Sequence, residues 1–343
     1  MKDQFITGNV SVSGMTIPEV STQLRFKDHL GAMMVRWGFN RDNYRVNPGL
    51  YAAGNPGADS EVLVTSNYKL TFDHLRKSIQ GINAWILVLD TKGINVWCAA
   101  GKGTFSTKEL VNRINAAGLE KIVTHKRLIL PQLGATGVAA HKVREQTGFN
   151  VHYGPVLSAD IKKFIADGYR ADRDMRKVKF RFTDRLKLIP NDFMYGKFYL
   201  LAAMLIMVLC SGLSSNGLDF KSLQSEAFPV MLRILLAYMA GIVFTPMFLP
   251  YIPGRHFSLK GFVTGTLVFL AFLVTGSLAG NNIEKVSWFL IIVAIASFMA
   301  MNFTGTSTFT SLSGVKKEMK LFLPLQIGFV GTGLILNIIG KYI

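Results

Sequence analysis

The sequence predicts a Rossmann-like α/β domain followed by an all-α domain of five transmembrane helices. Half of the 343 residues are hydrophobic, yet the formal net charge is +17, so apolar and basic residues must be segregated along the chain. Charges are scattered up to about Ile189, and long apolar segments follow one another after Tyr195. We expect an N-terminal extension that packs on the soluble domain (residues 1–60), the α/β domain (61–171), a basic linker (172–195) and the transmembrane domain (196–343).

Short apolar runs alternate with amphipathic ones between residues 61 and 168, whereas residues 1–60 are expected to be irregular and partly extended. The continuous apolar run 84–90 is typical of a strand buried on both faces, and Ser106 with Glu109 fits a capping box. This alternation predicts a parallel, doubly wound sheet, whose ligands bind beyond the carboxyl ends of the strands. The predicted strands are 62–65, 84–90, 127–130 and 149–156, and the predicted helices are 71–79, 106–116, 137–146 and 159–166.

Three loops follow strands of this predicted sheet, at residues 65–68, 90–103 and 131–137. All three are rich in small or amide residues, which let the backbone approach a ligand closely. Around Cys98 the pattern leaves two structures open, a hairpin turn into a short strand or a short helix. In either case Gly101 and Gly103 are expected to end the element.

Five apolar segments are each about as long as a bilayer crossing requires. The flanking Lys and Arg residues predict their orientation. Eleven basic residues lie between residues 162 and 197, ahead of the first segment, whereas the loops predicted on the opposite side hold only Lys221 and Lys285. The predicted location is therefore a multi-pass protein of the cytoplasmic (inner) membrane with its soluble domain in the cytoplasm. The segments are 196–213, 228–249, 261–278, 286–302 and 321–339.

The basic residues ahead of the first segment are expected to attract anionic membrane lipid, at about 1 kcal/mol per residue near the surface. Nucleic acid is not expected as a partner, because the aromatic residues of a base-stacking site are not interleaved with the basic ones.

Cys98 is the only cysteine in the predicted soluble half. Free cysteines are most often small buried hydrophobic residues. A catalytic nucleophile is a second possibility, although the distance from Cys98 to His125 or His141 is not given by the sequence. A metal ligand is a third, and a single thiolate suits a metal whose other positions are filled by a macrocycle better than it suits zinc.

Residues 95–102, NVWCAAGK, resemble the signature of the corrinoid protein of bacterial and archaeal mercury methylation, a membrane-bound relative of the corrinoid iron-sulfur proteins. The resemblance extends to residues 62–68, 90–93 and 131–141, and to the five-span carboxyl half with residues 302–305. It implies a cobalamin-type corrinoid bound by the soluble domain, with Cys98 as the lower axial ligand of cobalt on a short cap helix.

The resemblance also implies further cofactor-binding residues. The lower face of the ring would be shaped by Asn95, Val96, Trp97, Ala99, Ala100, Gly101 and Lys102. In the neighbouring loops the predicted residues are Thr65, Asn67, Gln132, Gly134 and Gly137. Two departures are visible: Thr136 stands where family members often have Pro, and Asp73-His74 has the wrong spacing for the Asp-x-His-x-x-Gly motif of other cobalamin enzymes.

The activity implied by the resemblance is a corrinoid-dependent methyltransferase that passes a methyl group from cobalt to inorganic Hg(II), giving methylmercury. The implied partners are a small ferredoxin with two [4Fe-4S] clusters and a methyl donor system linked to methyltetrahydrofolate. Two alternatives stay open: a membrane corrinoid protein whose methyl acceptor is a thiol or another metalloid, and a non-enzymatic metal-binding membrane protein such as a transporter or sensor.

Overall fold

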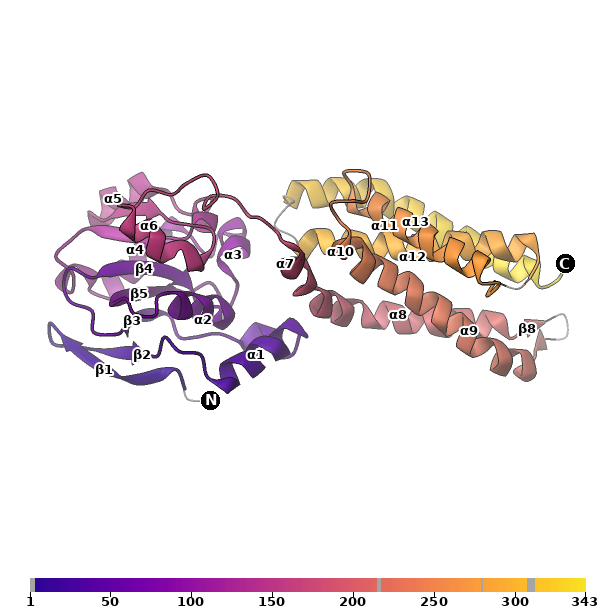
Figure 1. The fold of residues 1–343 in the computed structure, drawn as a ribbon, viewed down its shortest axis with the longest axis horizontal. Coiled ribbons are helices and arrows are strands. Elements are labelled where there is room, and N and C mark those ends of the chain that lie inside the picture. Colours follow the sequence, from indigo (N-terminus) through magenta and orange to yellow (C-terminus); the bar gives the residue numbers. More distant parts are fainter. Residues whose placement is uncertain (1–3, 215–216, 279, 307–311) are drawn as a thin grey trace. The chain divides into compact units, whose positions relative to one another are not determined.

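The computed structural model describes residues 4–214, 217–278, 280–306 and 312–343. The chain divides near Val178 into two compact units, an α/β unit and a helical unit (Figure 1).

The α/β unit contains one seven-stranded sheet with the strand order β1-β2-β3-β5-β4-β6-β7. Strands β5, β4, β6 and β7 pair with one another in parallel, which confirms the predicted parallel part of the sheet. The whole sheet is mixed, because residues 1–60, which were expected to be irregular and partly extended, add three strands: β3 runs antiparallel to β5, and β1 runs antiparallel to β2. The strands are β1 (Ile6–Val12), β2 (Met15–Val20), β3 (Gly49–Ala53), β4 (Glu61–Ser66), β5 (Ala84–Leu89), β6 (Arg127–Leu130) and β7 (Asn150–Tyr153).

The first 60 residues are therefore more regular than the sequence suggested. Strands β1 and β2 form a hairpin whose two-residue turn, Ser13-Gly14, has φ angles of 51° and 75°. A turn with two positive φ angles matches the twist of a hairpin, and glycine favours it. The Ser-Gly pair between two Val- or Ile-containing runs was the available signal for these strands.

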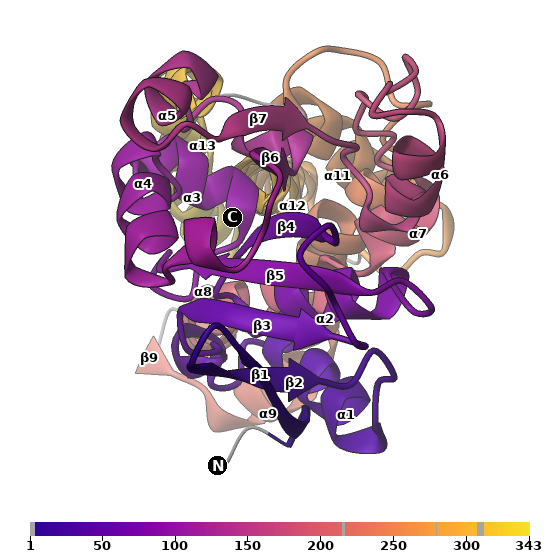
Figure 2. The ribbon, with the colours of Figure 1, turned by 90° about the vertical axis from the view of Figure 1, so that its left-hand side faces the viewer.

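Helices cover both faces of the sheet, as Figure 2 shows for α3, α4 and α5 on one side and α2 and α6 on the other. Alternate residues of β5 belong to two separate cores: Trp85, Leu87 and Leu89 to the first, and Ile86 and Val88 to the second. This explains why the strand is apolar throughout. The helices are α1 (Phe26–Arg36), α2 (Lys69–Ser78), α3 (Val96–Lys102), α4 (Thr107–Ala116), α5 (Ala140–Thr147) and α6 (Ile161–Ala166), with 3-10 turns at Arg41–Asn43, Leu119–Lys121, Gln132–Gly134 and Ser158–Asp160.

One of the two hydrogen bonds of the predicted capping box is formed, the one that Ser106 accepts. The Ser106 hydroxyl accepts a hydrogen bond from the backbone N–H of Glu109 at 3.3 Å, and so begins α4 as expected. The carboxylate of Glu109 accepts from the backbone N–H of Asp90 at 2.8 Å and from the guanidinium of Arg113. The start of α4 is thereby tied to the loop that leaves β5.

Four charged side chains fasten α1 to α2. Lys69 Nζ lies 2.7 Å from a carboxylate oxygen of Asp28 and 2.7 Å from one of Asp73. Arg76, whose side chain is fully buried, lies 2.8 Å from the carboxylates of both acids. A buried guanidinium is tolerated only where such partners surround it.

We expect Asp28→Asn to lower the free energy of unfolding by about 2 kcal/mol, because the variant loses charge-assisted hydrogen bonds to Lys69 and Arg76. Burial alone would raise the pKa of Asp28, but bonds from Lys69, the Arg25 backbone and Arg76 outweigh it and lower the pKa from 3.8 to about 2. The stabilisation is therefore present above pH 3.8 and is lost as pH falls toward 2.

Melting temperatures of the full-length protein in detergent check this prediction. The difference between wild type and Asp28→Asn should be largest at neutral pH and shrink on acidification, whereas Asp42→Asn, at an exposed position, should match wild type. A difference that does not depend on pH would contradict the assigned role of Asp28.

Among the described residues of the helical unit, five helices are long and apolar enough to cross a membrane, by length and composition: Phe182–Ser211, Phe220–Met247, Phe257–Val274, Asn282–Phe303 and Gly314–Gly340. Each overlaps one predicted segment.

Gly261 and Gly265 let α11 approach α12 closely, because a Cβ atom at either position would press on Ala296. The elements are α7 (Phe182–Leu186), α8 (Ile189–Ser211), β8 (Leu213–Ser214), β9 (Gly217–Leu218), α9 (Phe220–Met239), a π-helical turn (Ala240–Phe244), α10 (Thr245–Met247), α11 (Phe257–Val274), α12 (Asn282–Thr306) and α13 (Leu312–Gly340).

Candidate functional site

Cys98 lies on α3, a seven-residue helix that follows the carboxyl end of β5. The side-chain oxygen of Asn95 accepts a hydrogen bond from the backbone N–H of Cys98 at 2.9 Å and so caps the first turn. Gly103 ends the helix in the left-handed region, with φ 78°. Of the two structures that the sequence left open, the helix is the one formed, and Gly101 lies inside it rather than at its end.

The two faces of α3 have different surroundings. Val96, Ala99 and Ala100 are buried and belong to the core beneath the helix. Trp97 and Cys98 are half-buried, and Gly101 and Lys102 are exposed. Since Cys98 is partly accessible, it is not the small core residue that free cysteines most often are. Of the residues expected to shape the ring face, Trp97, Cys98, Gly101 and Lys102 form the accessible set, and the three core residues support them from below.

The accessible face of α3 has open space beside the thiol. Gly101 follows Cys98 by three residues and therefore lies on the same side of the helix. A Cβ atom built on Gly101 would meet nothing within 4 Å. The exposed positions Gly101 and Lys102 leave the surface beside Cys98 uncovered, which a broad, flat ligand laid against the thiol would require.

Asn67 fixes the loop that leads into α3. It is 2% exposed and follows β4. Its side-chain oxygen accepts hydrogen bonds from the backbone N–H groups of Thr91 (3.1 Å) and Gly93 (2.9 Å) and from the Thr91 hydroxyl (2.8 Å), and its amide nitrogen donates to Asp90 (3.1 Å). Asn67 was predicted to contact the cofactor, but its amide is fully used in holding residues 90–93. We therefore assign to Asn67 the role of positioning Cys98 through this loop.

We expect Asn67→Ala to lower the affinity for added corrinoid by about 10-fold, the lower end of the range for losing a group that positions a metal ligand, because Asn67 holds the loop that leads into α3. The buried N–H groups of Thr91 and Gly93 lose their acceptor, and the loop before Cys98 becomes mobile. Hydrogen exchange of residues 90–98 together with a corrinoid titration checks this. Asn95→Ala, which removes one capping bond of about 1 kcal/mol, is the milder comparison, and unchanged exchange in Asn67→Ala would contradict the assignment.

Gly134 and Gly137 serve close packing. A Cβ atom on Gly134 would lie 2.6 Å from the Phe105 ring, and one on Gly137 would overlap the Phe105 carbonyl oxygen and lie 3.1 Å from the Ala100 Cα atom. Phe105 itself is fully buried. The loop after β6 therefore holds the carboxyl end of α3 in place.

A tyrosine on the neighbouring strand supports the same loop. The Tyr153 hydroxyl donates to the Val138 carbonyl at 2.6 Å, and burial raises the pKa of Tyr153, so it stays a protonated donor.

The two remaining predicted loop residues have different environments. Thr65 is 2% exposed inside the sheet, whereas Gln132 is half-buried and its side-chain oxygen accepts a hydrogen bond from Arg176 at 3.2 Å. Thr91 and Phe105 were not among the predicted site residues, although both support the site. Phe105 is the one large apolar residue in the run Gly-Thr-Phe-Ser-Thr, which was the available signal.

If Cys98 were a catalytic nucleophile, His125 or His141 would be its base, and the structure excludes His125. His125 precedes β6 and bonds the Ser60 carbonyl at 2.9 Å, at the edge of the sheet opposite to α3. In the part of the chain that the structure describes, no three His, Cys, Asp or Glu side chains gather as a metal site.

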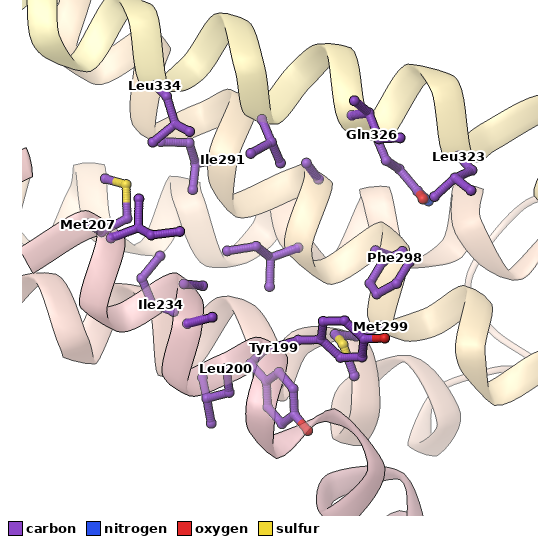
Figure 3. Close-up of a pocket in the computed structure, with 18 residues that line it drawn as sticks. Tyr199, Leu200, Met207, Ile234, Ile291, Phe298, Met299, Leu323, Gln326 and Leu334 are labelled. Carbon is purple, nitrogen blue, oxygen red and sulfur yellow. The ribbon is translucent and has the colours of Figure 1, made fainter.

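The helical unit contains a cavity of about 380 Å³ between α8, α9, α12 and α13 (Figure 3). Its one amide, Gln326, donates to the Ser297 hydroxyl at 2.8 Å. The side chains that Figure 3 labels include no His, Cys, Asp or Glu, so we place the candidate site on α3 instead. They are Tyr199, Leu200, Met207, Ile234, Ile291, Phe298, Met299, Leu323, Gln326 and Leu334.

Comparison with known proteins concerns the α/β unit. Residues 37–165 match the family model described as CO dehydrogenase/acetyl-CoA synthase delta subunit. This range contains Cys98 and the strands β3 to β7, and it leaves out β1, β2, α1 and the helical unit.

Curated relatives give a similar result. The acetyl-CoA decarbonylase/synthase complex subunit gamma of Archaeoglobus fulgidus is 33% identical over 127 residues, which are 36% of this chain and 27% of the relative. The subunit gamma of Methanosarcina acetivorans is 34% identical over 120 residues, 34% of this chain and 25% of the relative. The chain thus spans about a quarter of the length of these relatives, and the similarity is that of one module. Neither name refers to mercury.

Proposed function

We propose that the protein is a corrinoid-dependent methyltransferase that passes a methyl group to inorganic Hg(II) and gives methylmercury. The observation that carries this proposal is the accessible thiol of Cys98 on a short helix, capped at both ends, with open space beside it. The resemblance of residues 95–102 to the mercury-methylation signature gives the proposal its substrate. The match of residues 37–165 to a subunit of acetyl-CoA synthase supports one-carbon chemistry in this module.

In this proposal the Sγ atom of Cys98 would be the protein ligand that holds the cobalt of the corrinoid. Asn95 and Asn67 hold the first turn of α3 and the loop before it, so the sulfur is oriented before the cofactor arrives. Trp97 and Lys102 lie on the same accessible face, where an indole ring can stack and an ammonium can meet an amide or phosphate. The bound corrinoid supplies the cobalt centre that carries the methyl group. As a thiolate, Cys98 would donate more electron density to the metal than an imidazole ligand, and so would favour transfer of the methyl group to an electron-poor acceptor such as Hg(II).

The proposed partners follow from what the chain lacks. It has two cysteines, whereas an iron-sulfur cluster of the ferredoxin type takes four. The electrons that reduce the cobalt of the corrinoid must therefore come from another protein. We propose a small ferredoxin with two [4Fe-4S] clusters as this electron donor. A methyltetrahydrofolate-linked system would supply the methyl group.

We further propose that the five long apolar helices span the cytoplasmic membrane, with the α/β unit in the cytoplasm. Their length and composition and the basic residues ahead of the first helix support this location. The basic residues would contact anionic lipid.

The deciding experiment is an anaerobic assay of the full-length protein with corrinoid, reduced ferredoxin and a methyl donor. Hg(II), a thiol and arsenite are offered separately as acceptors. Methylmercury as the main product supports the proposal. Methylation of the thiol or arsenite alone would favour a different acceptor, and absence of bound corrinoid after anaerobic purification would favour a non-enzymatic metal-binding protein.

A further inference from the structure

An apolar stripe runs along α1 on the surface of the α/β unit. Its members recur at the spacing of one helix face and continue into the segment that follows the helix. We call this set the α1 stripe: Phe26 (80% exposed), Leu30 (39%), Met33 (52%), Met34 (44%) and Phe39 (52%). Large exposed apolar surfaces of this kind mark interaction sites.

The opposite face of α1 is firmly held. Asp28 is bound by Lys69 and Arg76 of α2, and Val35 is 2% exposed. The stripe is therefore a persistent surface of the folded unit and not a frayed end.

Charges beside the stripe identify the partner. Arg25 and Lys27 stand at the start of α1 and Arg36 at its end, whereas Asp28 is the one acid of this helix. Asp28 is turned toward α2 and its charge is already paired there. An apolar helix face bordered by basic residues is the pattern of helices that lie in the interface of an anionic bilayer.

We infer that α1 docks on the membrane, with the α1 stripe buried among the acyl chains just below anionic headgroups. This inference rests on the proposed membrane location of the helical unit. That location brings a bilayer within reach of the α/β unit, which a soluble protein would not have. The first four members of the stripe also precede residues 37–165, so they lie outside the module shared with the acetyl-CoA synthase subunit.

The test uses depth-dependent quenching in the full-length protein, reconstituted into phosphatidylcholine nanodiscs with and without anionic phosphatidylglycerol. In a Cys98→Ala, Cys210→Ala background, an environment-sensitive dye is attached through Met33→Cys, and spin-labelled lipid is the quencher. Two matched positions calibrate it: Leu205→Cys on the exposed face of α8, and Glu145→Cys on the exposed side of α5.

We expect quenching at positions 33 and 205 and none at 145. Quenching at 33 should strengthen with phosphatidylglycerol, and each of Arg25→Gln and Lys27→Gln should lower the ratio of docked to undocked protein by about fivefold. If 205 is quenched but 33 is not, α1 docking is wrong and the membrane location stands.

A blue-shifted but unquenched dye at 33 would mean that protein, such as a second copy of the chain, covers the stripe, and would also overturn the inference. If neither 33 nor 205 is quenched, the membrane location fails and α1 docking fails with it. None of these readouts depends on methyl transfer.

Discussion

Cys98→Ala is expected to reduce methylmercury formation by about 100-fold or more, since loss of a metal ligand exceeds the effect of losing an outer-sphere partner. The same change should convert the visible spectrum of the corrinoid-loaded protein from a thiolate-ligated form to one without a lower protein ligand. The physical reason is that α3 places one sulfur beside open space, and no other cysteine lies in the α/β unit. Anaerobic spectra of wild type and variant, recorded with the assay, check both effects.

Cys210→Ala is the matched control for this experiment, because it removes the same atoms from α8 in the helical unit. Its spectrum and activity should equal those of wild type. If Cys98→Ala retains activity and its spectrum is unchanged, Cys98 is not the cobalt ligand. If activity is lost while the spectrum is unchanged, Cys98 acts on the methyl acceptor and not on the cofactor.

Gly137→Ala is expected to lower the free energy of unfolding of the α/β unit by about 3 kcal/mol, the upper range for a forced overlap in a packed interior. The added Cβ atom would collide with the Phe105 backbone oxygen and press on Ala100 of α3. Backbone cannot rotate away as a side chain can, so α3 must shift and carry Cys98 with it. Hydrogen exchange of residues 96–105 and thermal unfolding of the full-length protein measure the effect.

Gly101→Ala makes the same chemical change on the open face of the same helix. It should leave the fold intact or stabilise it by about 0.5–1 kcal/mol, because alanine favours a helix interior over glycine. Corrinoid affinity should nevertheless fall, since the methyl group occupies space beside Cys98. Equal destabilisation by both substitutions would show that the loop after β6 does not hold α3 in the way the structure indicates.

The parallel core of the fold could be predicted from sequence because β4, β5 and β6 are dense apolar runs separated by helices that bury one face. The first three strands could not, since β1 carries Gly8, Asn9 and Ser11 between its apolar residues and β3 is five residues long. The pairing of β3 depends on long-range contact with β5, which no local pattern encodes, whereas the hairpin of β1 and β2 had the Ser13-Gly14 turn as its one local signal.

The position of Cys98 after a strand of the predicted sheet could be expected from the sequence, whereas the side chains that support it could not. Cys98, Trp97 and Lys102 lie on the accessible side of α3, and their contact with a corrinoid stays a prediction. The roles of Asn67, Gly134 and Gly137 were harder to read, because an amide or glycine near a ligand loop serves equally well to bind a ligand or to fasten the loop. Only the hydrogen bonds of Asn67 and the approach of Phe105 distinguish the two.

The hairpin of β1 and β2 has a consequence for any shortened form of the protein. Residues 37–165 are the shared module, yet β3 within it depends on β2 to occupy its outer side. A chain that starts at residue 37 would leave the main-chain donors and acceptors of a buried apolar strand facing water, ready to join the same strand of another molecule. Self-association into insoluble material, rather than an isolated functional module, is what such a trimmed protein would give.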